Sequence, residues 1–293
     1  MNYYRIPCTN PWWNMAFDEW LLHNGPDEPV FRLWRNEPSV IIGYNQAAAA
    51  EVNLDYLRGR GIKLARRVTG GGAVYHDLQN LNYTFAGPLG SQVAPEATSS
   101  DPVRSSAAHP SQPGGWAPPS NVAEGGTPLG DSTSGASSYL GIIVEALKSL
   151  GLPAELTGRN DIFVEGRKIS GYARSIWKNR EIVHGTLMYD VDIDTLTAAL
   201  NVEGSSKLAL KGVASVRSRV ANVKDYLPQF HSLDELEAAL QNTLAKVQNR
   251  PKMHFQPLSP AAGHLLTLTP AQLAAIDDLA SSKFASAEWI YRL

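Results

Sequence analysis

Cysteine is almost absent from this sequence of 293 residues. Cys8 is the only one, which excludes an intramolecular disulfide framework and a zinc site built from several cysteines. A chain without disulfides suits a reducing compartment. Its stability must come from a hydrophobic core, and a hydrophobic content of 43% is enough for one large domain or two modest ones.

Long apolar runs and a strong charge of one sign are also lacking. No run reaches the roughly 18 residues expected of a membrane span, and the N-terminus, MNYYRIPC, has no cationic segment followed by an apolar core. The formal net charge of −2 gives no global positive field for nucleic acid or an anionic membrane. We expect a cytoplasmic protein that binds neither nucleic acid nor a membrane. If a presequence precedes this sequence, the protein would be mitochondrial.

Aromatic residues nearly vanish between residues 88 and 137. Twenty-five of these 50 residues are Pro, Gly or Ser, and Trp116 is the only aromatic residue among them. Such a segment cannot bury enough apolar surface to offset its chain entropy. We predict a disordered surface insertion at 88–137 within one folded domain.

Elsewhere, periodicity and turn signals predict mixed helices and strands. Asn10-Pro11 is typical of an N-cap followed by proline at the first helical position, and Asn53 of the cap of a short helix. Apolar spacing and β-branched runs predict the remaining elements. The predicted strands are 30–34, 40–44, 162–164, 168–170 and 183–188, and further helices are predicted at 139–150, after Ser232 and after Thr269.

The most informative stretch runs from Lys63 to Asn82 and is predicted to form a strand, a tight turn and a strand. Gly70, Gly71 and Gly72 form the turn, with Arg66 and Arg67 just before it. Glycine allows main-chain N–H groups to approach a ligand closely, and guanidinium groups beside them suit a carboxylate or phosphate. The alternative is a glycine-rich hairpin with solvated arginines. The stretch is neither a Walker A loop nor a GxGxxG motif.

These residues resemble a known family. The run RRVTGGGAVYHD at 66–77, continued by NLNYTF at 80–85, resembles the lipoate-binding loop of lipoate–protein ligases. GRNDIFVEGRKISGYA at 158–173 and the first helix, from NPWWNMA at 10–16, resemble the same family. The resemblance implies an α+β fold of the biotin/lipoate-protein ligase type, related to class II aminoacyl-tRNA synthetases. It implies a single catalytic domain over 1–293, interrupted at 88–137, without the family's C-terminal accessory domain.

The activity that the resemblance implies is ATP-dependent. Lipoate would be activated to lipoyl-AMP, with Mg²⁺, and passed to a lysine of apo lipoyl domains of 2-oxoacid dehydrogenase acyltransferase subunits or of the glycine-cleavage H protein. Without an accessory domain we expect the chain to transfer lipoate from lipoyl-AMP readily but to activate free lipoate poorly, or to perform the transfer step alone, and a separate accessory protein would restore activation.

The resemblance also implies residue roles. Lys168 is the implied catalytic residue, because a fixed ammonium stabilises negative charge that develops in the transition state. The implied ATP-binding residues are Arg67, Gly72, Ala73, Val74, Tyr75, Asn160, Asp161 and Lys168, with Asp161 as the implied Mg²⁺ ligand. The implied lipoate-binding residues are Arg67, Thr69, Gly70, Gly71, Gly72, His76, Lys168, Ala173 and His184.

Each of these residues also has a purely structural explanation. An isolated lysine on a hairpin is ordinarily a solvated charge, and an Asn-Asp pair is ordinarily a turn. For His76 and His184 we expect hydrogen bonds that shape the pocket rather than general base catalysis.

Three other functions remain open. An octanoyl- or lipoyl-transferase of the same fold would need a thiolate, and Cys8 is predicted in the first strand, far in sequence from both motifs. A non-catalytic lipoate- or adenylate-binding paralogue is the second, and a biotin ligase is the third. Pyrophosphate exchange that depends on lipoate would separate catalytic from binding functions.

Overall fold

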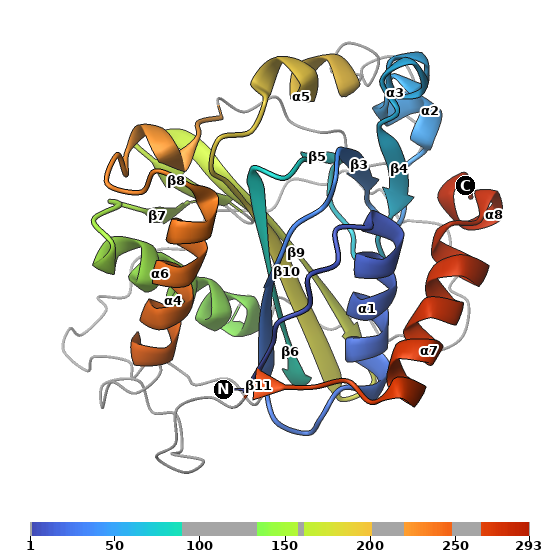
Figure 1. The fold of residues 1–293 in the computed structure, drawn as a ribbon, viewed down its shortest axis with the longest axis horizontal. Coiled ribbons are helices and arrows are strands. Elements are labelled where there is room, and N and C mark those ends of the chain that lie inside the picture. Colours follow the sequence, from blue (N-terminus) through green and yellow to red (C-terminus); the bar gives the residue numbers. More distant parts are fainter. Residues whose placement is uncertain (1, 90–133, 158–160, 201–219, 248–264, 293) are drawn as a thin grey trace, which may run out of the picture.

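The computed structural model describes residues 2–89, 134–157, 161–200, 220–247 and 265–292. A large sheet has the strand order β11-β1-β2-β6-β10-β9-β8-β7, and a small sheet has the order β4-β3-β5 (Figure 1). The large sheet is mixed: β1 pairs in parallel with β11 and β2, and the pairs from β2 to β7 are antiparallel. Its strands are β1 (Asn2–Tyr4), β2 (Val30–Trp34), β6 (Asn80–Pro88), β7 (Glu155–Thr157), β8 (Asp161–Val164), β9 (Arg167–Trp177), β10 (Arg180–Met188) and β11 (Leu265–Leu266).

Helices cover both faces of the large sheet. Figure 1 shows α4 and α6 on one side and α1 and α7 on the other. The remaining helices surround the small sheet or connect elements. The bounds are α1 (Pro11–Asn24), α2 (Ala48–Glu51), α3 (Leu54–Arg60), α4 (Ser134–Ser149), α5 (Ile193–Ala199), the 3-10 turn η1 (Val223–Asp225), α6 (Leu233–Val247), α7 (Pro270–Leu279), the π turn η2 (Ala280–Phe284) and α8 (Ala287–Ile290).

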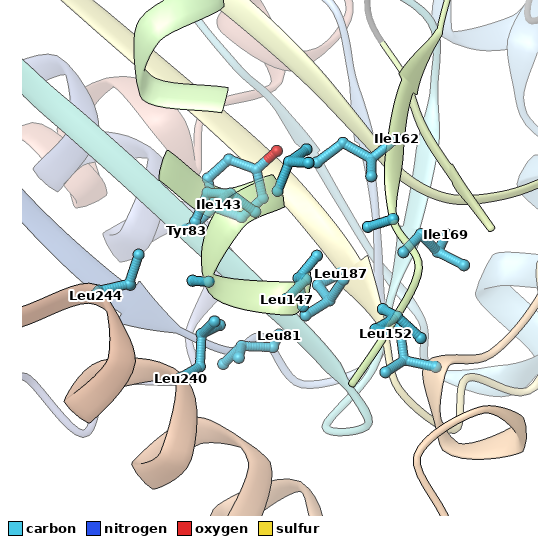
Figure 2. Close-up of a cluster of buried hydrophobic side chains, with 14 of the residues drawn as sticks. Leu81, Tyr83, Ile143, Leu147, Leu152, Ile162, Ile169, Leu187, Leu240 and Leu244 are labelled. Carbon is cyan, nitrogen blue, oxygen red and sulfur yellow. The ribbon is translucent and has the colours of Figure 1, made fainter. Parts of the chain in front are cut away.

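The two faces follow from side-chain alternation along the strands. On β2, Phe31 and Leu33 face the core under α4 and α6, whereas Val30 and Trp34 face the core under α1 and α7. Figure 2 shows the first of these cores, to which the sheet, α4 and α6 all contribute buried aliphatic side chains. Burial on both faces explains why β2 is apolar at four of its five positions, and the α+β prediction is confirmed.

The small sheet corrects the predicted hairpin of the glycine stretch. β3 (Ser39–Ile42) lies between β4 (Lys63–Arg66), which is parallel to it, and β5 (Val74–His76), which is antiparallel to it. The glycines therefore do not join neighbouring strands by a tight turn. Residues 67–73 cross the end of β3, which requires a span of roughly two strand spacings, about 10 Å.

Several local predictions are confirmed. The Asn10 side chain accepts hydrogen bonds from two N–H groups at the start of α1, and Asn53 caps α3. The predicted β8–β9 hairpin turns at Glu165 and Gly166, which both have positive φ, as a two-residue type I′ turn requires.

Other expectations are wrong or lie outside the described residues. Cys8 lies in the loop between β1 and α1 rather than in a strand. Most of the predicted insertion, residues 90–133, is outside the described residues. Among the helices that are described, none combines the length and the apolar character needed to cross a bilayer.

Candidate active site

The glycine loop is held in place by Arg67. Nη2 of Arg67 donates to the carbonyl oxygens of Gly70 and Gly72 at 2.7 and 2.8 Å, and Nη1 donates to that of Ile41 at 3.0 Å. Burial lowers the pKa of Arg67 to about 10, which leaves the guanidinium charged at neutral pH. A buried charge needs polar partners, and here the backbone of the loop supplies them. Arg67 thereby fixes the curvature of the loop.

The loop lies against strand β9 of the large sheet. Gly71 has a φ of 94°, a conformation that favours glycine. A Cβ atom built on Gly71 would lie 4.0 Å from Cβ of Ala173, so the small sheet and the large sheet meet here. The structure therefore brings together the two sequence motifs that lie about a hundred residues apart.

Lys168 lies on β9 near this junction. Its Nζ is 2.7 Å from Oδ1 of Asp161 on the neighbouring strand β8, and both side chains are about a quarter to a third exposed, at 26% and 30%. An ammonium that is held by one carboxylate and remains partly accessible can exchange that partner for a phosphate or another carboxylate. Asn160, predicted beside Asp161, lies outside the described residues.

Thr69 and His184 connect the loop to the core. The two ring nitrogens of His184 lie 2.7 Å from Oγ1 of Thr69 and 2.7 Å from Oδ2 of Asp18. Burial alone would raise the pKa of Asp18, but the charge of Arg32 and the bond to His184 outweigh it and lower the pKa. An ionised Asp18 accepts the hydrogen on Nδ1 of His184, and Nε2 of the same ring forms a hydrogen bond with the hydroxyl of Thr69.

The hydrogen-bonded side chains extend from Asp18 to His76. Arg32 bonds Asp18 at 3.0 Å and Asn14 at 3.1 Å, and Asn14 donates to Asn36 at 2.8 Å. Asn36 in turn lies 3.0 Å from Nδ1 of His76. The side chains from Thr69 to His76 are therefore connected by one buried network between α1 and the sheet.

His76 is buried, and its Nε2 has no hydrogen-bond partner among the described residues. Burial, together with the charges of Arg67 and His184, lowers the pKa of His76 to about 3. The imidazole is therefore neutral, and its unbonded Nε2 is enclosed by the protein.

The residues predicted to contact the nucleotide, Gly72 to Tyr75, lie at the end of the glycine loop and at the start of β5. Within the described part of the chain β5 pairs only with β3, so it is an edge strand of the small sheet. Val74 is half-buried and Tyr75 is buried. An edge strand presents one row of main-chain donors and acceptors that its own sheet does not use, as a bound base or phosphate requires.

Comparison with known proteins decides the family. A family model described as the lipoyl protein ligase A/B catalytic domain matches residues 10–99 and 128–245. The chain belongs to this family. The family predicted from the two motifs is thus confirmed.

Relatives of this lipoyl protein ligase family are similar over most of the chain. The lipoate-protein ligase LplJ of Bacillus subtilis is 37% identical over 79% of this chain and 58% of its own length. Lipoate–protein ligase 1 of Staphylococcus aureus is 37% identical over 80% of this chain and 60% of its own length. The chain spans about three-fifths of the length of these two curated relatives.

Solved structures of lipoate ligases share the fold. A bi-partite lipoate protein ligase of Thermoplasma acidophilum, described with its E2 lipoyl domain, is 28% identical, with a TM-score of 0.71 over 99% of this chain and 95% of that chain. A lipoate-protein ligase A bound with ATP is 27% identical, with a TM-score of 0.70 over 99% and 98% of the two chains.

Sequence reasoning missed the buried polar network behind the glycine loop. Its interior members are Asn14, Asp18, Arg32 and Asn36. Two signals were available. Asn14 and Asp18 are four residues apart, so they share one face of the predicted aromatic helix. Arg32 stands alone among apolar residues in β2. A charge in a strand that is buried on both faces requires a buried partner.

Proposed function

We propose that this chain is a lipoate–protein ligase that activates lipoate with ATP and transfers the lipoyl group to a protein lysine. The observation that supports the proposal most directly is the ion pair between Nζ of Lys168 and Asp161, on the strand that the glycine loop contacts. Lys168 therefore offers a partly exposed cation on β9, the strand that also contacts the glycine loop at Ala173. Such a site suits an anionic reaction centre.

The proposed reaction has two steps. The carboxylate of lipoate attacks the α-phosphorus of ATP, the bond to pyrophosphate breaks, and lipoyl-AMP forms. The amine of the acceptor lysine then attacks the acyl carbon, the bond to AMP breaks, and the nitrogen releases a proton to solvent as the amide forms. The ammonium of Lys168 stabilises the negative charge on the phosphate in the first step and on the carbonyl oxygen in the second.

We assign the two ends of the loop to the two substrates. The lipoate-binding residues form the part of the site nearest the core, and Arg67 acts through the loop that it holds. They are Arg67, Thr69, Gly70, Gly71, Gly72, His76, Lys168, Ala173 and His184. ATP is proposed to lie along Gly72, Ala73, Val74 and Tyr75, with Arg67, Asn160, Asp161 and Lys168 toward its phosphates.

Mg²⁺ is proposed to accompany ATP. It ordinarily binds through one or two carboxylates together with substrate phosphates, and the partly exposed carboxylate of Asp161 fits that pattern. Among the described residues no cluster of three His, Cys, Asp or Glu side chains could hold a metal without phosphates. Bound in this way, Mg²⁺ would neutralise phosphate charge.

The acceptors that we propose are apo lipoyl domains of 2-oxoacid dehydrogenase acyltransferase subunits and the glycine-cleavage H protein. The T. acidophilum structure, described with its E2 lipoyl domain, supports the first class. A cytoplasmic location is proposed with them, because these acceptors and ATP must be reached together.

A cysteine-dependent transferase is disfavoured by Cys8. Burial, above all, raises the pKa of the Cys8 thiol. A thiolate nucleophile requires the opposite shift. The backbone of Cys8 bonds Asn14 of the core network rather than the glycine loop.

The test is isotope exchange between pyrophosphate and ATP by the purified chain. We expect exchange that depends on lipoate and is lost in Lys168→Ala, while Lys148→Ala, on the exposed surface of α4, is unaffected. Exchange without lipoate overturns the proposed ligase, and so does a wild-type chain that neither exchanges pyrophosphate nor transfers the lipoyl group of lipoyl-AMP to an apo lipoyl domain.

A further inference from the structure

Lys168 and Gly171 lie on the same face of β9, although they are three residues apart. Successive side chains of a regular strand point to opposite faces, so residues three apart should be on opposite sides. The pairing of β9 with β8 is irregular at this place. Ile162 faces Ser170 and Phe163 faces Lys168, so Ile169 is an extra residue without an opposite partner.

This β-bulge sets the direction of the lysine. Ile169 is fully buried in the core shown in Figure 2, and the hydroxyl of Ser170 lies 3.1 Å from that of Tyr83 in the same core. Ile169 and Ser170 thus both face the core, and the normal alternation of side chains between the two faces of β9 resumes before and after them. A bulge re-aims a neighbouring side chain in this way. It turns Lys168 to the face that carries Gly171 and Ala173.

The side chain of Lys168 then passes over Gly171. A Cβ atom built on Gly171 would lie 3.0 Å from Nζ and 3.1 Å from Cε of Lys168, and 3.4 Å from Oδ1 of Asp161. The backbone does not require glycine here, because the glycines with positive φ are at other positions. Glycine inside a strand is destabilising and often marks close approach of another group. The group that approaches is the ammonium.

We propose that Gly171 is the positioning residue of the catalytic ammonium: its missing side chain leaves the space in which Nζ of Lys168 lies beside Asp161. The proposal rests on the proposed function of Lys168. The proposal deepens that function, because it explains two features of β9. The bulge at Ile169 directs Lys168 toward Asp161, and the glycine at position 171 leaves room for the lysine side chain.

The effect of an added methyl group is predicted to be local. The atoms that it would meet belong to the ends of two side chains, which can rotate away, and not to the backbone. Gly171→Ala should therefore fold normally, since alanine fits an ordinary strand conformation. The ammonium would be displaced, and a displacement of about 1 Å at a reacting centre can cost on the order of 10²-fold in rate.

The first experiment measures lipoyl-AMP formation and thermal unfolding together. We expect Gly171→Ala to lower the rate by at least 10-fold with nearly unchanged Tm. The matched control is Gly59→Ala in α3, where a Cβ meets nothing within 4 Å, and it should leave the rate unchanged and raise Tm by no more than a few degrees. An active wild type with an equally active Gly171→Ala overturns the proposal.

A double-mutant cycle shows whether Gly171 acts through Lys168. Calorimetry gives the affinity for a non-hydrolysable lipoyl-adenylate analogue in wild type, Gly171→Ala, Lys168→Ala and the double variant. We expect the double variant to bind as Lys168→Ala alone does. If Gly171→Ala reduces the affinity by the same factor in wild type and in Lys168→Ala, Gly171 does not act through the lysine.

A third readout separates this proposal from the ligase function. Acetic anhydride labels exposed amines, and mass spectrometry reports the labelling of Lys168 relative to Lys178 in the same chain. We expect the ratio to change in Gly171→Ala. An unchanged ratio refutes the placement even if the wild type makes no lipoyl-AMP, a result that by itself would count only against the ligase.

Discussion

The indole nitrogen of Trp289 donates a hydrogen bond to the carbonyl oxygen of Arg66 at 3.0 Å, and Nε of Arg66 donates to the carbonyl oxygen of Trp289 at 2.9 Å. The guanidinium of Arg66 is fully buried and donates to further carbonyl oxygens on both sides. These belong to Gly43, Tyr44, Gln46, Ile290 and Arg292. Arg66 therefore connects the C-terminal helix α8 to the base of the glycine loop, and it is not free to bind an anion.

Replacing Arg66 with alanine is expected to lower the free energy of unfolding by about 3 kcal/mol or more, because several buried carbonyl groups would lose their donor. Denaturant unfolding measures the change. Arg58→Ala is the control, since the Arg58 side chain is 77% exposed and its loss should cost less than about 0.5 kcal/mol. Equal midpoints for the two variants would show that the hydrogen bonds of Arg66 add little.

Replacing Lys168 with alanine is expected to lower the rate of lipoyl-AMP formation by on the order of 10²–10³-fold, the usual effect of losing one preorganised charge-stabilising group. The fold should survive, because the side chain is partly exposed and its ion pair lies at the surface. Single-turnover formation of lipoyl-AMP and a thermal melt measure both quantities. A variant that forms lipoyl-AMP at nearly the wild-type rate removes Lys168 from the mechanism.

The sequence predicted those parts of the site that consist of contiguous motifs. The β8–β9 hairpin and the helix caps each depend on a few neighbouring residues, so local patterns were sufficient. The order of β4, β3 and β5 was not predictable in this way. Which strand lies between two others depends on pairing across the chain, and the spacing of the glycines does not record it.

The roles of the two arginines were equally hidden. Arg66 and Arg67 are adjacent in sequence, and the resemblance singled out Arg67 without assigning a role to Arg66, yet one bonds the C-terminal segment and the other bonds the loop. Only the positions of the carbonyl groups around them separate these roles. The bulge at Ile169 was missed for the same reason, because a bulge is a property of the strand pair.

His76 is expected to make stability depend on pH. The unfolded imidazole titrates near pH 6.5, whereas burial lowers the pKa in the folded chain to about 3. Between these values the unfolded chain holds a proton that the folded chain lacks, so stability falls as the pH falls, by up to about 1.4 kcal/mol per pH unit. Unfolding free energies between about pH 4.5 and 6.5 avoid most carboxylate titration.

The variant His76→Gln should flatten this slope, because glutamine can accept the bond from Asn36 but does not titrate. His231→Gln, at an exposed position, serves as the control and should keep the slope. If wild type and His76→Gln lose stability in parallel over this range, the His76 imidazole is protonated in the folded chain.

Residues 100–127 are expected to be dispensable for folding and for acceptor lipoylation. They lie between the two parts that the family model matches, within a segment that is half Pro, Gly and Ser. Both flanks are anchored: the N–H of Leu89 donates to the carbonyl of Asn179 at 2.6 Å, and α4 resumes the core from Tyr139 onward. Because loop-closure entropy grows only logarithmically with length, a short Gly/Ser linker should change Tm by no more than a few degrees.

Acceptor modification, read by mass spectrometry, should proceed at the wild-type rate. A large fall in Tm would show that this segment packs on the domain, and an unchanged Tm with slower lipoylation would show that it contacts the acceptor.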